Sequence, residues 1–436
     1  MAAVADVVHL LRRCEFVARP ERVAQLTPLD LTAAVDDVLD IAQNGVVDVP
    51  VELRQPPPDG GSWDQYVEAC RWWMQAMLDR PRPLSERLAL FWHGHFTSAW
   101  WDIEHGWTVV DQVHIYRRNA LGSFEQMAQE MATSPAMLQY LSNGVNQKRK
   151  PNQNFGRELL ELFLLGAGSY AESDVEACAR AWTGHNYDRA TYSYVFKPTA
   201  HDTDLKTFFG VTRNWDGPDT IHYIVGGENP QLQLVCARFI ARKLFESFAY
   251  PNPSATVVEQ LAAGFVAGGM QLRPLVRAIL LHPEFWSVAS RQGLVRTPVE
   301  LATAIAYYAH VTPEETGFAW RGESMGQILY NPPNVSGWRP NAYWLSTAAV
   351  SARAGLARQV TWTVRDRGEY EELYPMTAAD AVAYVASKFG VDLSDVTRTA
   401  LVAAHTAERS SVRWANWWGP TNLVTMMMAT PEFNQA

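Results

Sequence analysis

Repeated helical periodicity is the feature that most restricts the fold of this chain of 436 residues. In residues 63–80 the apolar side chains recur at helical spacing and form one stripe, made of Tyr66, Ala69, Trp73 and Met77. Ser62 is a favoured N-cap for this helix, and Pro81 ends it. The same signal marks residues 5–18, 84–93, 109–120, 123–133, 153–165, 172–182, 231–247, 255–268, 297–310, 345–359, 377–389 and 395–408. We therefore expect a mostly α, large multi-helix globular protein.

Signals for β-strands are few. Residues 191–197 alternate in polarity and are rich in strand-forming side chains, and residues 206–211 are their expected partner in a hairpin. Strands do not alternate with helices along the chain. Neither a G-x-G-x-x-G nor a G-x-x-x-x-G-K-[ST] motif follows a strand, so the sequence excludes Rossmann and P-loop folds. We expect at most one short β-hairpin.

Charge and cysteine content exclude several classes of protein. The net charge is -9, and the densest basic run, at 147–150, is too short for a nucleic-acid surface. No apolar run is long enough to span a membrane, and Arg12 and Arg13 interrupt the first apolar stretch, unlike a signal peptide. We expect a cytoplasmic location with no nucleic-acid or membrane partner. No C-x-x-C pair occurs, so we expect buried reduced thiols at Cys14, Cys70, Cys178 and Cys236.

The chain is expected to form one continuous globule in three parts: an N-terminal helical segment (1–80), a core that carries the site (81–364) and a C-terminal helical cap (365–436). Two loops stand out. Residues 43–62 contain four prolines, as in an extended linker, and residues 329–345 have the composition of an ordered loop that lines a site. The 17 tryptophans serve either core packing or a cleft that stacks sugar rings. Those at 414, 417 and 418 suggest that the cap docks on the main body.

The stretch Pro151–Gly166 carries two carboxylates on a strongly apolar helix. Asn154, Glu158 and Glu161 fall on one stripe of this helix, which should be buried. Buried carboxylates must be paired, hydrogen-bonded or bound to a cation. The stripe is therefore either a structural ion-pair network, with Arg157 neutralising Glu161, or part of a metal or acid–base site.

Histidines provide the other candidate ligands. His93 and His95 could bind one metal only if Gly94 ends the helix that contains them or if the segment is extended. Buried histidines that bond backbone groups are the alternative. His201 and Asp202, followed by Lys206, stand in a loop where a metal ligand or an oriented general base is expected. The other histidines considered, at positions 105, 114 and 185, have no convincing spacing.

Nine ordered blocks in the chain resemble those of one bacterial family, Domain of Unknown Function 1800. They are ERLALFWHGHF (86–96), YRRNALGSF (116–124), SPAMLQYLSNGVNQ (134–147), PNQNFGRELLELFLLGAGSY (151–170), DVEACARAWTG (174–184), HDTDLKTFFG (201–210), FIARKLFESF (239–248), TPVEL (297–301) and MGQILYNPPNVSGW (325–338). The resemblance implies a helical fold and gives weight to positions, but it implies no reaction. The matching positions are His93, His95, Asn152, Asn154, Arg157, Glu158, Glu161, Arg180, His201, Asp202 and Lys206.

The chain departs from the family pattern at three positions. Gly94 stands where Asn is common, His185 stands where Trp usually follows the Thr-Gly pair, and Arg339 separates Trp338 from Pro340. These departures suggest a distinct pocket, so a substrate cannot be transferred from relatives.

The function predicted from these residues is that of a metal-dependent enzyme, with hydrolysis favoured. The expected ligands of a zinc, iron or manganese ion are His93, His95, Glu158, Glu161, His201 and Asp202. The expected catalytic residues are Glu158, Glu161, Arg157 and Lys206. The expected substrate-binding residues are Asn154, Arg180, Trp92 and Trp338, and the expected substrate is a small molecule, a glycan or a peptide.

Three alternatives stay open. Iron-dependent oxidation uses the same ligand types, although Glu-x-x-Glu replaces the Glu-x-x-His of di-iron bundles. Metal-free acid–base catalysis would need two carboxylates on opposite faces of the substrate, which neighbours on one helix do not provide. A non-catalytic binding or scaffold protein would use the same charges as a buried network.

Overall fold

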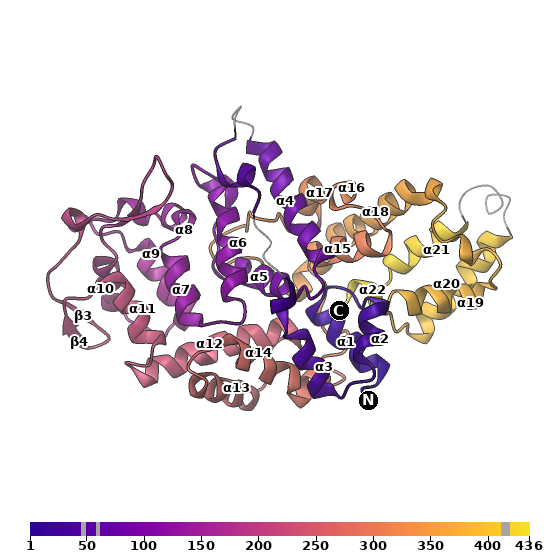
Figure 1. The fold of residues 1–436 in the computed structure, drawn as a ribbon, viewed down its shortest axis with the longest axis horizontal. Helices are drawn as coiled ribbons and strands as arrows, with labels where there is room; N and C mark the ends of the chain where they lie inside the picture. The colour runs from indigo at the N-terminus through magenta and orange to yellow at the C-terminus, as the bar shows by residue number, and fades with distance from the viewer. Residues whose placement is uncertain (45–48, 58–61, 411–418) are drawn as a thin grey trace.

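Apolar stripes at helical spacing become the buried faces of the helices in the computed structural model, which describes residues 1–44, 49–57, 62–410 and 419–436 (Figure 1). Helix α4 (Ser62–Asp79) buries its predicted stripe, since Tyr66, Ala69, Trp73 and Met77 are each at most 1% exposed. Pro81 follows its end as expected. The mostly α, multi-helix prediction is confirmed.

The helices between Ser62 and Met325 form three groups, one at the centre of the molecule, one at the left and one below the centre (Figure 1). The central group is α4, α5 (Leu84–His95), α6 (Thr108–Asn119), α15 (Pro298–Tyr308), α16 (Pro313–Thr316) and α17 (Phe318–Met325). At the left are α7 (Phe124–Ala132), α8 (Pro135–Tyr140), α9 (Gln153–Glu158), the π-helix η5 (Leu159–Leu165), α10 (Glu172–Ala181) and α11 (Gly217–Val225). Below the centre run α12 (Pro230–Phe248), α13 (Ala255–Ala267) and α14 (Leu272–Leu281).

The first and the last helix lie side by side near the middle of the molecule (Figure 1). The N-terminal helices are α1 (Val4–Cys14), α2 (Pro20–Leu26) and α3 (Leu31–Val38), and the C-terminal ones are α18 (Thr347–Val364), α19 (Ala378–Lys388), α20 (Asp395–Arg409), α21 (Gly419–Met428) and α22 (Pro431–Asn434). The Arg12 guanidinium of α1 donates to the carbonyls of Glu432, at 2.9 Å, and of Gln435. One long-range contact thus joins the first helix to the last.

The strands form two hairpins, so the expectation of at most one was wrong. Strand β2 (Tyr194–Phe196) pairs with β1 (His185–Tyr187), and β3 (Lys206–Phe208) pairs with β4 (Val211–Arg213). The expected pairing of 191–197 with 206–211 fails because β3 turns back at once. Phe209 and Gly210, with φ of 45° and 78°, provide the left-handed conformation of a tight two-residue hairpin turn.

The structure also bears on the expectations for the cysteines, for membrane-spanning helices and for the linker. The four cysteines are buried and free. Within the described residues, no helix has both the length and the apolar character needed to cross a bilayer. Of the expected linker 43–62, the described part contains a short 3-10 turn, Val51–Arg54, and 45–48 and 58–61 lie outside the described residues. Trp414, Trp417 and Trp418 also lie outside them, and the division into three parts stays a prediction.

A buried carboxylate fixes the three central helices. Glu86, at the start of α5, is fully buried and accepts a hydrogen bond from the Trp73 indole of α4 at 2.9 Å. Its oxygens also lie 2.5 Å from the Arg80 guanidinium and 2.8 Å from that of Arg117 in α6. One anion between two buried cations is stabilising only while all partners are present.

Replacement of this carboxylate is therefore expected to destabilise the protein strongly. Glu86→Ala leaves Arg80 and Arg117 without their anion and should lower the free energy of unfolding by about 3–5 kcal/mol. Urea denaturation measures the change. The control is Glu68→Ala, which breaks an exposed pair with Arg71 and should cost less than about 1 kcal/mol. Equal losses in the two variants would contradict the role of Glu86.

Candidate metal centre

The two histidines of α5 point to different partners. Helix α5 continues through Gly94 to His95, so the break that would bring both rings together is not formed. His93 Nε2 accepts a hydrogen bond from the Tyr330 backbone N–H at 3.1 Å. His95 Nε2 donates to the Phe163 carbonyl at 3.0 Å, and its Nδ1 accepts from the Lys243 ammonium at 2.8 Å. The lone pair that each ring would offer to a metal is already used.

Burial keeps both rings neutral. Desolvation lowers the pKa of His93 to about 3. Burial, with a further contribution from the Lys243 charge, holds the pKa of His95 well below its ordinary value. Both rings are at most 2% exposed and pack against aromatic side chains of the core. His93 and His95, two of the expected metal ligands, are therefore buried histidines with protein partners, which was the alternative to metal binding.

The expected stripe of 153–165 lies at the junction of α9 and η5. Glu161 accepts a short hydrogen bond from the Tyr170 hydroxyl. Arg157 donates to Glu172 at 2.6 Å, so the expected neutralisation of Glu161 by Arg157 was wrong: the guanidinium turns toward the first turn of α10. Both carboxylates are half-buried, and burial together with the nearby Glu161 charge raises the pKa of Glu158. Asn154 donates to the Leu141 carbonyl at 3.1 Å.

Among the described residues, one set of three side chains has the geometry of a metal site. His185, His201 and Asp216 place ligand atoms within 4.8 Å of one another. Asp216 Oδ1 lies 2.8 Å from His185 Nε2 and 4.0 Å from His201 Nε2. The two imidazoles are 2% and 8% exposed, whereas the carboxylate is 45% exposed and opens the group on one side.

Hydrogen bonds orient both rings of this triad (His185, His201 and Asp216). His201 Nδ1 donates to the Thr183 carbonyl at 2.8 Å, which leaves its lone pair on Nε2, the atom nearer to Asp216. His185 Nδ1 bonds the Tyr194 hydroxyl at 2.8 Å. Metal-binding histidines commonly use the second ring nitrogen in this way, because the bond fixes the tautomer and the ring plane.

Local backbone chemistry brings the triad together. Gly184 has φ of +82°, and a Cβ there would lie 2.8 Å from the Lys197 carbonyl and 3.1 Å from the His201 Cβ. Glycine thus lets β1 begin directly against His201. Asp216 is the N-cap of α11, where its carboxylate accepts from the Gly217 N–H at 2.8 Å. Burial raises the pKa of Asp216, but bonds from His185 and Gly217 lower it overall.

Three further expected residues surround the triad without joining it. Asp202 accepts from Arg180 Nε at 2.7 Å, and its backbone N–H donates to Thr183 Oγ1 at 2.8 Å, so it anchors the loop that carries His201. The buried Lys206 ammonium donates to Asn214 Oδ1 at 3.0 Å and to the Trp215 carbonyl at 2.9 Å. It thereby holds the segment that leads into Asp216. All three positions orient the triad from outside.

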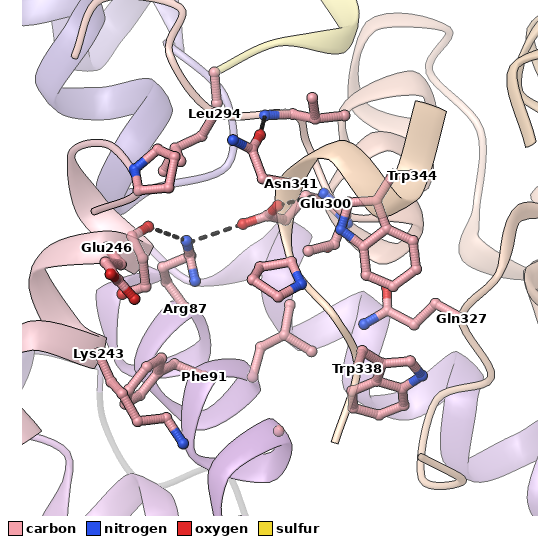
Figure 2. Close-up of a pocket in the computed structure, with 18 of the residues that line it drawn as sticks. Arg87, Phe91, Lys243, Glu246, Leu294, Glu300, Gln327, Trp338, Asn341 and Trp344 are labelled. Carbon is pink, nitrogen blue, oxygen red and sulfur yellow. Dashed lines mark hydrogen bonds and ion pairs between the residues drawn. The ribbon is translucent and has the colours of Figure 1, made fainter. Parts of the chain in front are cut away.

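The two expected substrate-binding tryptophans differ in exposure. Trp92 is fully buried and packs on His95, Phe96 and Phe124, so the fold covers its ring. Trp338 lies in the loop 329–345 and lines a pocket at the centre of the molecule (Figure 2). The loop thus lines a pocket, and its part in a functional site stays a prediction.

The sequence from residue 9 to residue 435 matches the model of a family described as protein of unknown function (DUF1800). The chain belongs to this family. No curated protein and no solved structure matches the chain.

Within this DUF1800 chain, sequence reasoning missed two of the three triad residues. His185 was set aside for lack of a spacing motif, although it is one of the departures from the family pattern. Asp216 carries only the signal of an N-cap before Gly217 and Pro218. The three ligands come from a strand, a loop and a helix start, so no fixed spacing connects them.

The buried histidines predict how stability depends on pH. His93 has a pKa of about 3 in the folded protein and an ordinary value of 6.5, so the unfolded chain takes up the proton first. Its contribution to stability is complete above pH 6.5 and is lost as the pH falls. Urea denaturation should show that His93 alone costs about 2 kcal/mol between pH 7 and pH 5. His93→Gln retains an acceptor without titrating, and an unchanged pH slope in this variant would contradict the prediction.

Proposed function

We propose that this protein is a metal-dependent enzyme with hydrolytic chemistry, in which His185, His201 and Asp216 hold one divalent ion. The observation that carries the proposal is the convergence of two imidazole nitrogens and one carboxylate oxygen within 4.8 Å. The ring bonds to Thr183 and Tyr194, at 2.8 Å each, add support because they fix both rings toward Asp216.

The donor set suits a catalytic ion. Two imidazoles and one carboxylate are the protein ligands of several catalytic zinc sites, which keep a further position open. A divalent ion bound there supplies Lewis acidity and lowers the pKa of a water ligand to about 7. The partial exposure of Asp216 leaves that side accessible to a substrate, which we expect to be a small molecule, a glycan or a peptide.

The surrounding residues act on the ligands. Arg180 and Asp202 fix the loop before β3, and the Lys206 ammonium bonds the carbonyl that precedes Asp216. These bonds hold His201 and Asp216 in place before an ion binds. We therefore assign Arg180, Asp202 and Lys206 as positioning residues in this proposal, in place of the direct roles expected from the sequence.

Two other functions have an observation in their favour. The set of two histidines and one carboxylate is also that of non-haem iron(II) oxygenases, which favours an iron-dependent oxidoreductase. A scaffold role is favoured by the 2.8 Å bond between His185 and Asp216 and by the N-cap bond to Gly217, because both satisfy these groups without an ion.

Metal binding separates the enzyme proposals from the scaffold. The wild-type protein, dialysed against zinc, iron(II) or manganese(II), should retain one equivalent of one ion in elemental analysis. His201→Ala and Asp216→Asn each remove a ligand and should abolish retention with the circular dichroism unchanged. Tyr194→Phe should weaken binding by about 10- to 100-fold in calorimetry because it removes an orienting bond. His222→Ala, which removes an exposed histidine paired with Glu125 at 2.7 Å, is the matched control.

The identity of the ion and the reaction then separate the two enzymes. A zinc-loaded wild type that hydrolyses ester or peptide test substrates, with the activity lost in His201→Ala, supports hydrolysis. Oxygen uptake by the iron(II) form alone supports the oxidoreductase. A wild type that retains none of the three ions, or variants that retain as much as wild type, overturns the proposal and leaves the scaffold.

A further inference from the structure

A second candidate site lies away from the triad and shares no residue with it. A pocket of about 390 Å³ opens between α1, α5, α12, the start of α15 and the loop 329–345 (Figure 2). One part of its wall is apolar and includes Leu90, Phe91, Leu294, Trp338, Pro340 and Trp344. The other part is charged. This combination is typical of pockets for small amphipathic molecules.

The charged wall contains more cations than its anions neutralise. Its side chains include Arg12, Arg13, Arg87 and Lys243, against two side-chain carboxylates, Glu246 and Glu300, and Ala436 brings the carboxylate of the last residue to the wall. The two side-chain carboxylates have partners of their own.

The Glu300 carboxylate is paired with groups of the pocket wall itself. Glu300 accepts from Arg87 Nε at 2.9 Å and from the Thr297 backbone N–H at 2.7 Å (Figure 2). The second, Glu246, accepts from the Asn252 backbone N–H at 3.1 Å. Neither forms an ion pair with Lys243 or Arg13, so the carboxylates act on these cations only at longer range, Glu246 on Lys243 and Glu300 on Arg13.

Lys243 is the most available of these cations. Its ammonium donates one hydrogen bond, to the Nδ1 of neutral His95 at 2.8 Å, and lies 5.2 Å from the centre of the Phe239 ring. Within the described part of the chain no carboxylate lies within ion-pair distance of it. Burial lowers its pKa to about 8, so the ammonium is still the main form at neutral pH. A desolvated ammonium with two unused donors is a strong site for an anion.

Two further side chains of the wall, Arg13 and Trp344, contain donor atoms without partners. Arg13 is 1% exposed, and its Nε and NH1 have no hydrogen-bond partner in the structure, although its NH2 donates to the Ser290 and Ala249 carbonyls. The indole N–H of the buried Trp344 is likewise without a partner. These donor atoms are covered by protein, so the argument for an anion rests on the Lys243 ammonium.

We propose that this pocket binds a small organic acid, whose carboxylate pairs with the Lys243 ammonium and whose apolar body lies against Phe91 and Trp338. The site is independent of the proposed metal centre. The protein thus has a binding function for a carboxylate ligand whether or not His185, His201 and Asp216 hold an ion.

A pair of isosteric probes tests the charge requirement. Naphthalene-1-acetate carries the carboxylate, and naphthalene-1-acetamide has the same shape without the charge. Calorimetry and tryptophan fluorescence quenching should show that the wild type binds the acetate at least about tenfold more tightly, because hydrogen bonds to charged groups are worth more than neutral ones. Equal affinities, or no binding of the acetate up to millimolar concentration, would overturn the proposal without any variant.

Variants then locate the ligand. Lys243→Met should remove the preference for the acetate, whereas Lys243→Arg should retain it. Trp338→Ala should weaken both probes by a similar factor, because that ring contacts the shared apolar body. Lys150→Met, which removes an exposed cation outside the pocket, should change nothing. A preference that persists in folded Lys243→Met would show that the carboxylate binds elsewhere and would reject the assignment. None of these readouts depends on a metal ion.

Discussion

The Glu86 carboxylate is the interaction on which the rest of the structure depends. It is fully buried between two guanidinium groups and an indole, and these partners come from the segments on both sides of α5. A charge in such a position is tolerated only in a fixed geometry, because every displaced partner leaves an ion unsolvated. Helix α5 is therefore set in direction and rotation at its first turn.

The rotation of α5 decides what its later residues can do. Arg87, Phe91 and Gly94 face the central pocket, whereas Trp92 turns into the core. His95 lines the pocket but bonds the Phe163 carbonyl of η5. The histidines of this helix thus pack in the interior and form hydrogen bonds there. The Lys243 ammonium donates to the other nitrogen of this ring, Nδ1, so the proposed anion site and the core of the molecule share the His95 imidazole.

The helices could be predicted from the sequence because each segment carries its own periodicity and caps. The stripe of α4 and the capping box of α15, which begins at Thr297, are examples of such local signals. The strand pairing could not be predicted, since it depended on the conformation of Phe209 and Gly210 in a two-residue turn. Gly94 misled in the opposite direction: glycine often ends a helix, but here tertiary packing carried α5 one residue further.

The candidate site was predictable only in part. Residues 180, 201, 202 and 206 were all singled out, and they gather around one group because Arg180, Asp202 and Lys206 hold the backbone beside it. His185 and Asp216 were not singled out, since their convergence is a property of the folded chain. The matching positions of the family therefore mark a supporting framework as well as candidate ligands.

The contact between α1 and the last helix has a consequence for the order of assembly. Arg12 and Arg13 belong to the pocket wall, and Arg12 takes acceptors about 420 positions later in the chain. At usual translation speeds of about 5–20 residues per second, those acceptors are synthesised roughly 20–80 seconds after the first helix. During that interval Arg12 lacks these two acceptors, whereas the acceptors of Arg13, the Ala249 and Ser290 carbonyls, are made earlier. The part of the pocket wall that Arg12 forms is therefore fixed only after residues 432–435 have been synthesised.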